Sequence, residues 1–177
     1  FRDDLLVSST DPDGARSDYR HDATGNLIHA SHPPNAVRTF THDARGRLQT
    51  VTLDDRLVAA FDYDAFDNVI AQTDAAGSRT LRRYDPLGRV IEELDPAGGI
   101  TRTTYDRLGH ATSHTCADGT EITTDHDVLG NPIRVKDGTG FAVDVTYAGT
   151  GALTSVAYSD GRAWQFHYNP AERIQAM

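Results

Sequence analysis

Apolar and polar residues alternate along short segments of the chain with a period of two residues. In residues 58–63, Ala59, Phe61 and Tyr63 alternate with positions that are less apolar. An alternation over six or seven residues predicts a β-strand with one face richer in apolar side chains. The same alternation, again with aromatic residues on one face, recurs in residues 37–42, 142–147 and 163–168.

Glycine and proline interrupt these segments throughout the chain, which contains 15 Gly and 7 Pro. No segment between them is long enough to show a helical period of 3.6 residues. Strands joined by tight turns predict an all-β fold, an antiparallel meander of about sixteen strands. Such a strip twists and does not bury its own face, so we expect it to coil as a β-strand spiral.

A 21-residue period organises the turns. The anchor position carries Asp in six of eight copies and Gly follows three residues later in six of eight. The anchor column is Asp22, Asp43, Asp64, Asp85, Asp106, Asp127, Ala148 and Asn169. The glycine column is Gly25, Gly46, Gly88, Gly109, Gly130 and Gly151, with Asp67 and Glu172 in the other two copies.

Tyrosine or histidine precedes each anchor, and an aliphatic residue, Ala or Pro follows each turn. Asp first and Gly fourth predict a type I turn that ends in a left-handed residue and joins two strands as a hairpin. We expect Asp67 to tolerate that conformation and Glu172 to be strained. The preceding column is His21, His42, Tyr63, Tyr84, Tyr105, His126, Tyr147 and Tyr168. The following column is Leu27, Leu48, Val69, Val90, Ala111, Pro132, Leu153 and Ile174.

Each Tyr or His should therefore pack across its hairpin against the residue of the following column. A second turn occupies the other half of the period, as in 11–14, 74–77, 95–98 and 116–119. We interpret the recurring Tyr, Asp and Gly residues as a structural repeat framework. The period places all 177 residues in a single array of about eight repeats, and we expect it to be a piece of a longer array.

Charge and composition exclude several classes of protein. The formal net charge is −9 and the sequence pI is about 5.2, which argues against general binding to nucleic acid or to an anionic membrane. No apolar run is long enough for a membrane-spanning helix, and no signal peptide opens the sequence. Cys116 stands alone, so neither an intrachain disulfide nor a cysteine metal cluster is expected.

The polar residues offer little support for catalysis or for a metal site. The aspartates recur at one turn position, which indicates capping rather than a catalytic pair. Calcium-binding β-rolls have a nine-residue period, unlike this chain. The histidines of the Tyr column are read as substitutes for Tyr, and neither His29 with His32 nor His110 with His114 has ligand geometry on a strand. We therefore expect no enzyme activity, no catalytic residue, no cofactor and no metal.

The heptapeptide YDPLGRV at 84–90 resembles the Y-D-x-x-G-[RN]-[LV] motif of the YD repeat, also called the RHS repeat. HDATGNL (21–27), HDARGRL (42–48) and YDRLGHA (105–111) match with one or two changes. The resemblance covers essentially the whole chain. It implies a β-strand spiral that closes, with further repeats, into part of a hollow shell.

In bacterial polymorphic toxins and insecticidal toxin complexes of this family, the shell encloses a C-terminal toxin domain until delivery. The resemblance thus implies a secreted or delivered structural protein whose partners are the remaining shell repeats and an enclosed toxin polypeptide. This chain shows neither the family's autoproteolytic core segment nor a separate toxin or protease domain. The alternative is an adhesion module that binds a surface glycan or a receptor, as the related teneurin barrel suggests. Aromatic candidates for stacking on sugars are Tyr19, Phe40, Phe61, Phe66 and Trp164.

Overall fold

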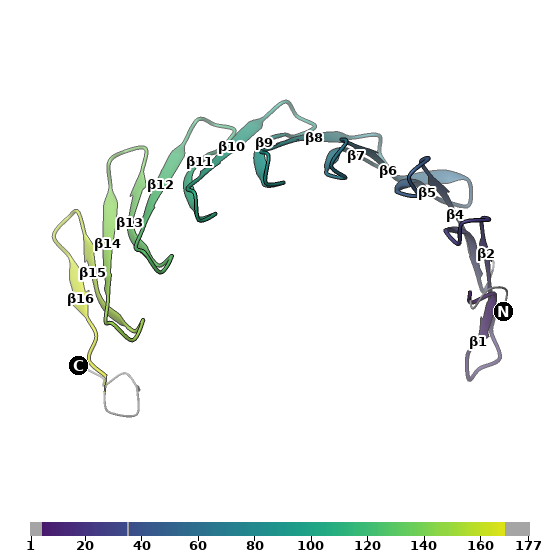
Figure 1. Ribbon diagram of the computed structural model, residues 1–177, viewed down its shortest axis with the longest axis horizontal. Coiled ribbons are helices and arrows are strands. Elements are labelled where there is room, and N and C mark those ends of the chain that lie inside the picture. The colour runs from purple at the N-terminus through teal and green to yellow at the C-terminus, as the bar shows by residue number, and fades with distance from the viewer. Residues whose placement is uncertain (1–4, 35, 169–177) are drawn as a thin grey trace. The chain divides into compact units, whose positions relative to one another are not determined.

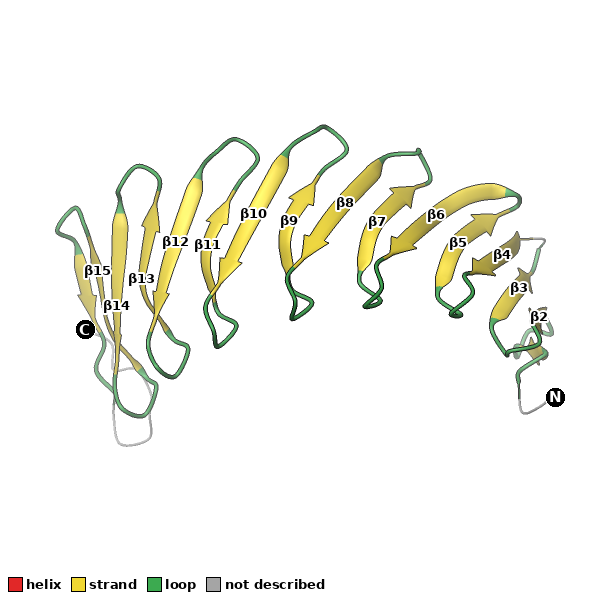
Figure 2. Cartoon of the chain, turned by 45° about the horizontal axis from the view of Figure 1, so that its top comes forward, coloured by secondary structure: helices red, strands yellow, loops and turns green. Residues whose placement is uncertain are grey.

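The computed structural model describes residues 5–34 and 36–168 and confirms the all-β prediction. These residues form β-strands and turns without any helix, and the strand order of the sheet is the chain order, from β1 to β16. The strands and the short turns that join them can be followed in Figure 1 and Figure 2. Because the described residues contain no helix, none spans a membrane as one. The sequence predictions for Asn35, Asn169, Glu172 and Ile174 lie outside the described residues.

The chain divides into two compact units, residues 1–89 with 94–98 and residues 90–93 with 99–177. Within each unit, consecutive strands pair antiparallel. The strands of the first unit are β1 (Ser8–Thr10), β2 (Arg16–His21), β3 (Leu27–His32), β4 (Ala36–His42), β5 (Leu48–Leu53), β6 (Arg56–Tyr63), β7 (Val69–Asp74) and β8 (Arg79–Tyr84). The chain continues with β9 (Val90–Leu94), β10 (Ile100–Tyr105), β11 (Ala111–Thr115), β12 (Glu121–His126), β13 (Pro132–Asp137), β14 (Ala142–Tyr147), β15 (Leu153–Tyr158) and β16 (Ala163–Gln165).

The turns of the 21-residue motif, here called YD turns, share one backbone arrangement. In the YD turn at 43–46, the Gly46 amide donates to the Asp43 carbonyl (2.9 Å) and the Asp43 amide donates to the Arg47 carbonyl (2.9 Å). Gly46 has a φ of 80°, a left-handed conformation that glycine adopts without strain. The positive φ predicted for the fourth turn position is confirmed, and Asp67 tolerates it with a φ of 70°.

A β-bulge follows six of the described YD turns and fixes the register. In the β4–β5 hairpin, Thr41 is opposite Thr50 but His42 is opposite Leu48, so Gln49 is the extra residue. The bulge returns the Tyr or His of each hairpin to a position opposite the apolar residue, and this predicted pairing is confirmed. The pairs are His21–Leu27, His42–Leu48, Tyr63–Val69, Tyr105–Ala111, His126–Pro132 and Tyr147–Leu153.

One turn of the second kind is shorter than the others, yet the period survives. Asp54 and Asp55, with φ values of 47° and 63°, form a two-residue connection between β5 and β6. Two consecutive residues of positive φ are typical of a type I′ hairpin turn. Across these strands Val51 faces Ala59 while Thr52 faces Leu57, so Val58 is an extra residue in β6. The extra residue in this bulge compensates for the residue that the shorter turn lacks, so the repeat keeps its length of 21 residues.

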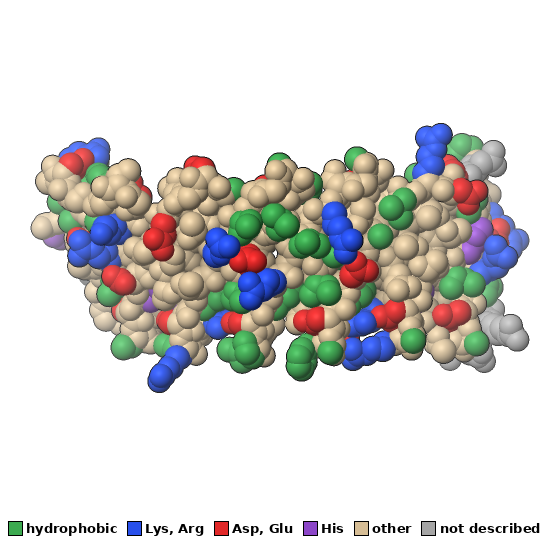
Figure 3. Space-filling view, turned by 90° about the horizontal axis from the view of Figure 1, so that it is seen from above, with side chains coloured by type: hydrophobic (Ala, Val, Ile, Leu, Met, Phe, Trp, Pro, Cys, Tyr) green, Lys and Arg blue, Asp and Glu red, His purple; other side chains and the backbone are tan. Residues whose placement is uncertain are grey.

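Little of the chain is buried within either unit. Among the described residues, only Ala30, Ala71 and Ala142 are buried hydrophobic residues, and no large side chain is fully buried. Apolar side chains lie among charged ones on the face drawn in Figure 3. Large apolar residues are also exposed at the tips of YD turns: Phe66, Leu87, Leu108, Val128 and Leu129. The strands are therefore held by their ladders and by contacts between neighbouring turns, since the described residues form no two-layer core.

We predict that Gly88→Val destabilises the protein. Gly88 has a φ of 77°, and a Cβ there would lie 3.3 Å from Asn68 Oδ1. A β-branched residue held in the left-handed region costs on the order of 1–3 kcal/mol. The measurement is the free energy of unfolding by urea. Gly88→Asn is the matched control and should lose less stability, because Asn accepts positive φ; equal losses for the two variants would contradict the assigned turn.

Candidate functional site: the clasp between YD turns

The side chain of the anchoring aspartate organises each YD turn through both of its oxygens. Asp43 Oδ1 accepts the amides of Arg45 (2.8 Å) and Arg47 (3.0 Å), and Asp43 Oδ2 accepts Arg47 Nε (2.7 Å). The residue four positions after the aspartate donates to Oδ2 in every described copy that keeps the Asp. These pairs are Asp22–Asn26, Asp43–Arg47, Asp64–Asn68, Asp85–Arg89, Asp106–His110 and Asp127–Asn131.

These hydrogen bonds favour the ionised carboxylate. The Arg47 side chain is the main cause that lowers the pKa of Asp43 from 3.8 to about 2. For Asp106, removal from water raises the pKa, but the bonds from the His110 side chain and from backbone amides outweigh it and lower the value to about 2. The pKa of Asp64 and that of Asp85 are also lowered, first by the side chains of Asn68 and Arg89, respectively. The turns are therefore built around charged acceptors.

The side chain that the aspartate holds extends onto the YD turn of the next repeat. The Arg47 guanidinium lies over the Tyr63 ring, 4.6 Å from its centroid, and Arg47 Nη1 donates to the Asp64 carbonyl (2.7 Å). Asn26 and Asn68 lie in the same way against Gly46 and Gly88 of the following turns. We call this arrangement the clasp: the anchoring Asp and the residue four positions later in one turn, with the Tyr or His and the Gly of the next.

At one YD turn the clasp adds a steric reason for glycine at the fourth position, besides its positive φ. A Cβ on Gly130 would collide with the His110 ring, which occupies the space above that glycine. Asp67 is the exception, and its turn is adapted to it. Its carboxylate accepts Arg47 Nη1 (2.7 Å) and pairs with Arg45 Nη1 (3.0 Å), so two arginines of the preceding turn engage the side chain that replaces glycine.

The tyrosine hydroxyl adds a second link between neighbouring hairpins. Tyr63 Oη donates to the carbonyl oxygen of Leu48 (2.8 Å), which begins the second strand of the preceding YD hairpin. The acceptor is always the residue 15 positions earlier, in the apolar column after the previous turn. The other bonds are Tyr84 to Val69 (2.7 Å), Tyr105 to Val90 (3.0 Å) and Tyr147 to Pro132 (3.0 Å).

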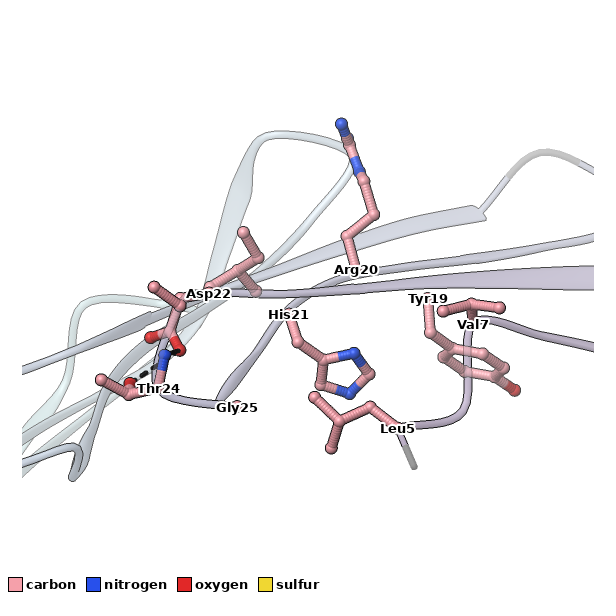
Figure 4. A pocket seen from close by; sticks show the side chains of 10 residues that line it. Leu5, Val7, Tyr19, Arg20, His21, Asp22, Thr24 and Gly25 are labelled. Atoms are coloured by element: carbon pink, nitrogen blue, oxygen red, sulfur yellow. Dashed lines mark hydrogen bonds between the residues drawn. The ribbon is translucent and has the colours of Figure 1, made fainter. Parts of the chain in front are cut away.

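Histidine in the Tyr column keeps the ring but not this hydroxyl bond. His42 Nδ1 and His126 Nδ1 are buried and have no hydrogen-bond partner in the described part of the chain. At His21 the ring lies beside Leu5, with Tyr19 on the same side of the strand and Arg20 on the other (Figure 4). These residues line a shallow pocket with Val7, Asp22 and Thr24. Leu5 stands 16 residues before His21, as Arg47 stands before Tyr63, and so it occupies the clasp position.

The other residues that the sequence named as candidates for metal, framework or glycan sites lie apart from one another. His114 Nδ1 is 3.1 Å from Thr103 Oγ1, and His32 Nδ1 is 2.8 Å from Ser17 Oγ, so each histidine is bonded to a strand neighbour. Ala148 keeps the turn bonds of its backbone without a carboxylate. Tyr168 lies at the end of the described residues. Among the aromatic candidates for glycan stacking, Phe66 and Trp164 are exposed, whereas Tyr19, Phe40 and Phe61 are partly buried.

Sequence reasoning missed the clasp, although its signal is periodic. The position four residues after the anchor reads Asn26, Arg47, Asn68, Arg89, His110 and Asn131. The motif includes Arg or Asn at this position, but the motif alone does not indicate what the side chain contacts. Sequence reasoning also missed the group formed by Asp106, His110 and His126 in the second unit, because it paired His110 only with His114.

The meander and its clasps define a β-repeat protein in which a repeat contacts the repeats beside it in sequence. Residues 2–35 and 63–100 match the family model described as RHS Repeat, which confirms over these residues the predicted resemblance to the RHS-repeat, or YD-repeat, family. A comparison with curated protein sequences finds no match.

Solved structures share the fold at low sequence identity. A chain of the Photorhabdus luminescens Tc holotoxin pore aligns with a TM-score of 0.65 and 16% identity over 88% of this chain. The TcdB2–TccC3–Cdc42 structure aligns with a TM-score of 0.53 and 15% identity over 95% of this chain. The present chain spans only 10% and 12% of those chains, respectively. The likeness therefore concerns the fold of a segment.

We predict that Tyr84→Phe lowers stability by removing the hydroxyl bond to the Val69 carbonyl. A net loss of about 0.5–1.5 kcal/mol is expected for one such hydrogen bond. His42→Tyr is the converse test, because it supplies a hydroxyl where the column lacks one, and it should raise the melting temperature. Urea unfolding and thermal melting check both variants. No loss in Tyr84→Phe would show that the hydroxyl bond does not hold the hairpins together.

Acid should weaken the folded state in a defined range of pH. Because the pKa of Asp43 is lower in the folded chain, the folded state binds fewer protons than the unfolded state between pH 3.8 and about 2. The stability that this carboxylate contributes is complete above that range and is lost as the pH falls through it. Thermal melting measured from pH 7 to pH 2 checks this. Asp43→Asn should melt lower than the parent at pH 7 and lose less on acidification; parallel curves would contradict the assignment.

Proposed function

We propose that this chain is a segment of the wall of an RHS-repeat shell, whose function is to enclose a toxin polypeptide until it is delivered. The observation that carries the proposal is the meander itself, a sheet in which strands follow one another in chain order and several YD turns are clasped to the next. The fold shared with segments of Tc toxin structures supports the same role. The mechanism is containment rather than catalysis.

The physical basis of containment is the continuity of the backbone ladder. Within each unit, the paired consecutive strands share cross-strand hydrogen bonds. A polypeptide would have to break these hydrogen bonds to pass between two strands. Tyrosine hydroxyl bonds join neighbouring hairpins at the YD-turn end. Such a sheet separates its two sides although it has no thick core.

Few of the described residues suggest recognition of a small ligand. The pocket beside His21 is lined in part by polar side chains, and it lies between residues 5–7 and the YD turn at 22–25. The aspartates of the YD turns are engaged by their own turns, so they are not available as a catalytic pair. The functional residues of the wall are therefore those of the clasp.

The test uses the natural protein in which these repeats occur. An epitope tag is placed on the segment that follows the array, and the native protein is digested with a nonspecific protease. The tagged segment is expected to survive until denaturant unfolds the array. Protection of the tag is read by immunoblotting, and unfolding is followed in parallel by circular dichroism.

Two controls make the result specific to enclosure. The tagged segment expressed alone should be digested at once, which shows that it is not intrinsically resistant. A second tag in the exposed turn at Leu87 should be lost early, which shows that the protease is active on the native protein. Immediate loss of the C-terminal tag while the array stays folded would overturn the proposal and favour an open scaffold for adhesion.

A further inference from the structure

The clasp that links the YD turns at 106–109 and 127–130 has an unusual composition. In the other described copies the pair formed by the clasp residue and the next Tyr-column residue contains at most one imidazole. These pairs are Leu5–His21, Asn26–His42, Arg47–Tyr63, Asn68–Tyr84, Arg89–Tyr105, Asn131–Tyr147 and Ala152–Tyr168. Here the pair is His110 and His126, so two imidazoles meet beside the Asp106 carboxylate.

The three side chains converge in the second unit. The imidazole rings are stacked, with centroids 5.0 Å apart and planes inclined by 28°. Asp106 Oδ2 lies 2.9 Å from His110 Nδ1. One nitrogen of each histidine and one carboxylate oxygen all lie within 4.8 Å of one another. Small side-chain movements would bring such donors to the roughly 2.0–2.2 Å at which Zn²⁺ binds nitrogen and oxygen.

One buried nitrogen of this group has no hydrogen-bond partner among the described residues. This atom is His126 Nδ1, and burial without a partner is unfavourable for an imidazole nitrogen. Asp106 Oδ1 accepts the amides of Leu108 and His110, and Asp106 Oδ2 lies against the His110 ring. The side chains of Asp106 and His110 are 31% and 28% exposed, which leaves a route from solvent.

We propose that Asp106, His110 and His126 bind one divalent transition-metal ion of the Zn²⁺ or Ni²⁺ type. Each side chain supplies one donor atom, and water completes the coordination. Where His110 binds through Nδ1, the proton of that nitrogen is released to water, and the metal also accepts the lone pair of a His126 nitrogen. Two imidazole nitrogens with one carboxylate oxygen suit these ions rather than Ca²⁺, which takes six or more oxygens.

The proposal does not depend on the enclosing function, because it concerns only a link between two neighbouring turns. A metal held by residues of consecutive repeats would cross-link those repeats, and it would stabilise the folded state by mass action. Since the unfolded chain does not hold the three donors together, binding and folding are coupled.

The experiment is isothermal titration of the purified protein, freed of metal with EDTA, with ZnCl₂ and separately with NiCl₂. Saturable binding of one ion per chain is expected, together with a higher melting temperature in ZnCl₂. His110→Asn and His126→Tyr should each weaken binding at least tenfold. Both variants are expected to fold, because Asn26, Asn68 and Asn131 occupy the same position as His110, and Tyr occupies that of His126 in most copies.

Histidines elsewhere in the described residues supply the matched controls. His42→Tyr makes the same exchange at a clasp with a single imidazole, and His114→Gln removes the nearest histidine in sequence. Both should bind Zn²⁺ as the parent does. The proposal is overturned if the parent shows no saturable 1:1 binding, or if binding survives His110→Asn and His126→Tyr but is lost with His42 or His114. Imidazole resonances of His110 and His126 in the unsubstituted protein should shift on Zn²⁺ addition, and unchanged resonances would also overturn it.

Discussion

The hydrogen-bonded aspartate at the start of each YD turn is the interaction on which the rest of this structure depends. One carboxylate oxygen closes the turn on two backbone amides, and the other orients the side chain four residues later. That oriented side chain meets the aromatic ring and the glycine of the next turn. Because the described residues contain only three buried hydrophobic residues, all alanine, this local chain of contacts takes the part that a packed core has in an ordinary domain.

The constancy of the period follows from this dependence. A clasp works only if the side chain of one turn arrives opposite the glycine of the next, so a repeat that gained or lost one residue would place the wrong side chain there. The β5–β6 connection shows how the register is kept. Its turn uses only Asp54 and Asp55, and the Val58 bulge restores the position of Tyr63. Bulges in the sheet thus allow the turns to vary while the clasp columns stay fixed.

Much of this fold could be predicted from the sequence because the determinants of its turns are local. Asp at the first position and Gly at the fourth specify the hairpins, and the alternation of Ala59, Phe61 and Tyr63 specifies a strand. The clasp could not be predicted as easily, since it joins residues 16 to 20 positions apart whose meeting depends on strand pairing and bulges. Tyr63 illustrates the difference: its pairing with Val69 follows from the hairpin, whereas its hydroxyl bond to Leu48 depends on the neighbouring hairpin.

A repeated clasp also separates what must be kept from what is free to change. The aspartate, the turn conformation and the aromatic column fix the geometry, while the side chain held between them varies among Asn, Arg and His. Each choice gives the same link a different chemistry: an amide beside a glycine, a guanidinium over a ring, or two stacked imidazoles beside a carboxylate. Since each repeat contacts mainly its neighbours, such a change acts on one link and leaves the others intact. A sheet built in this way is able to acquire a local ligand site without altering the ladders of strands that carry it.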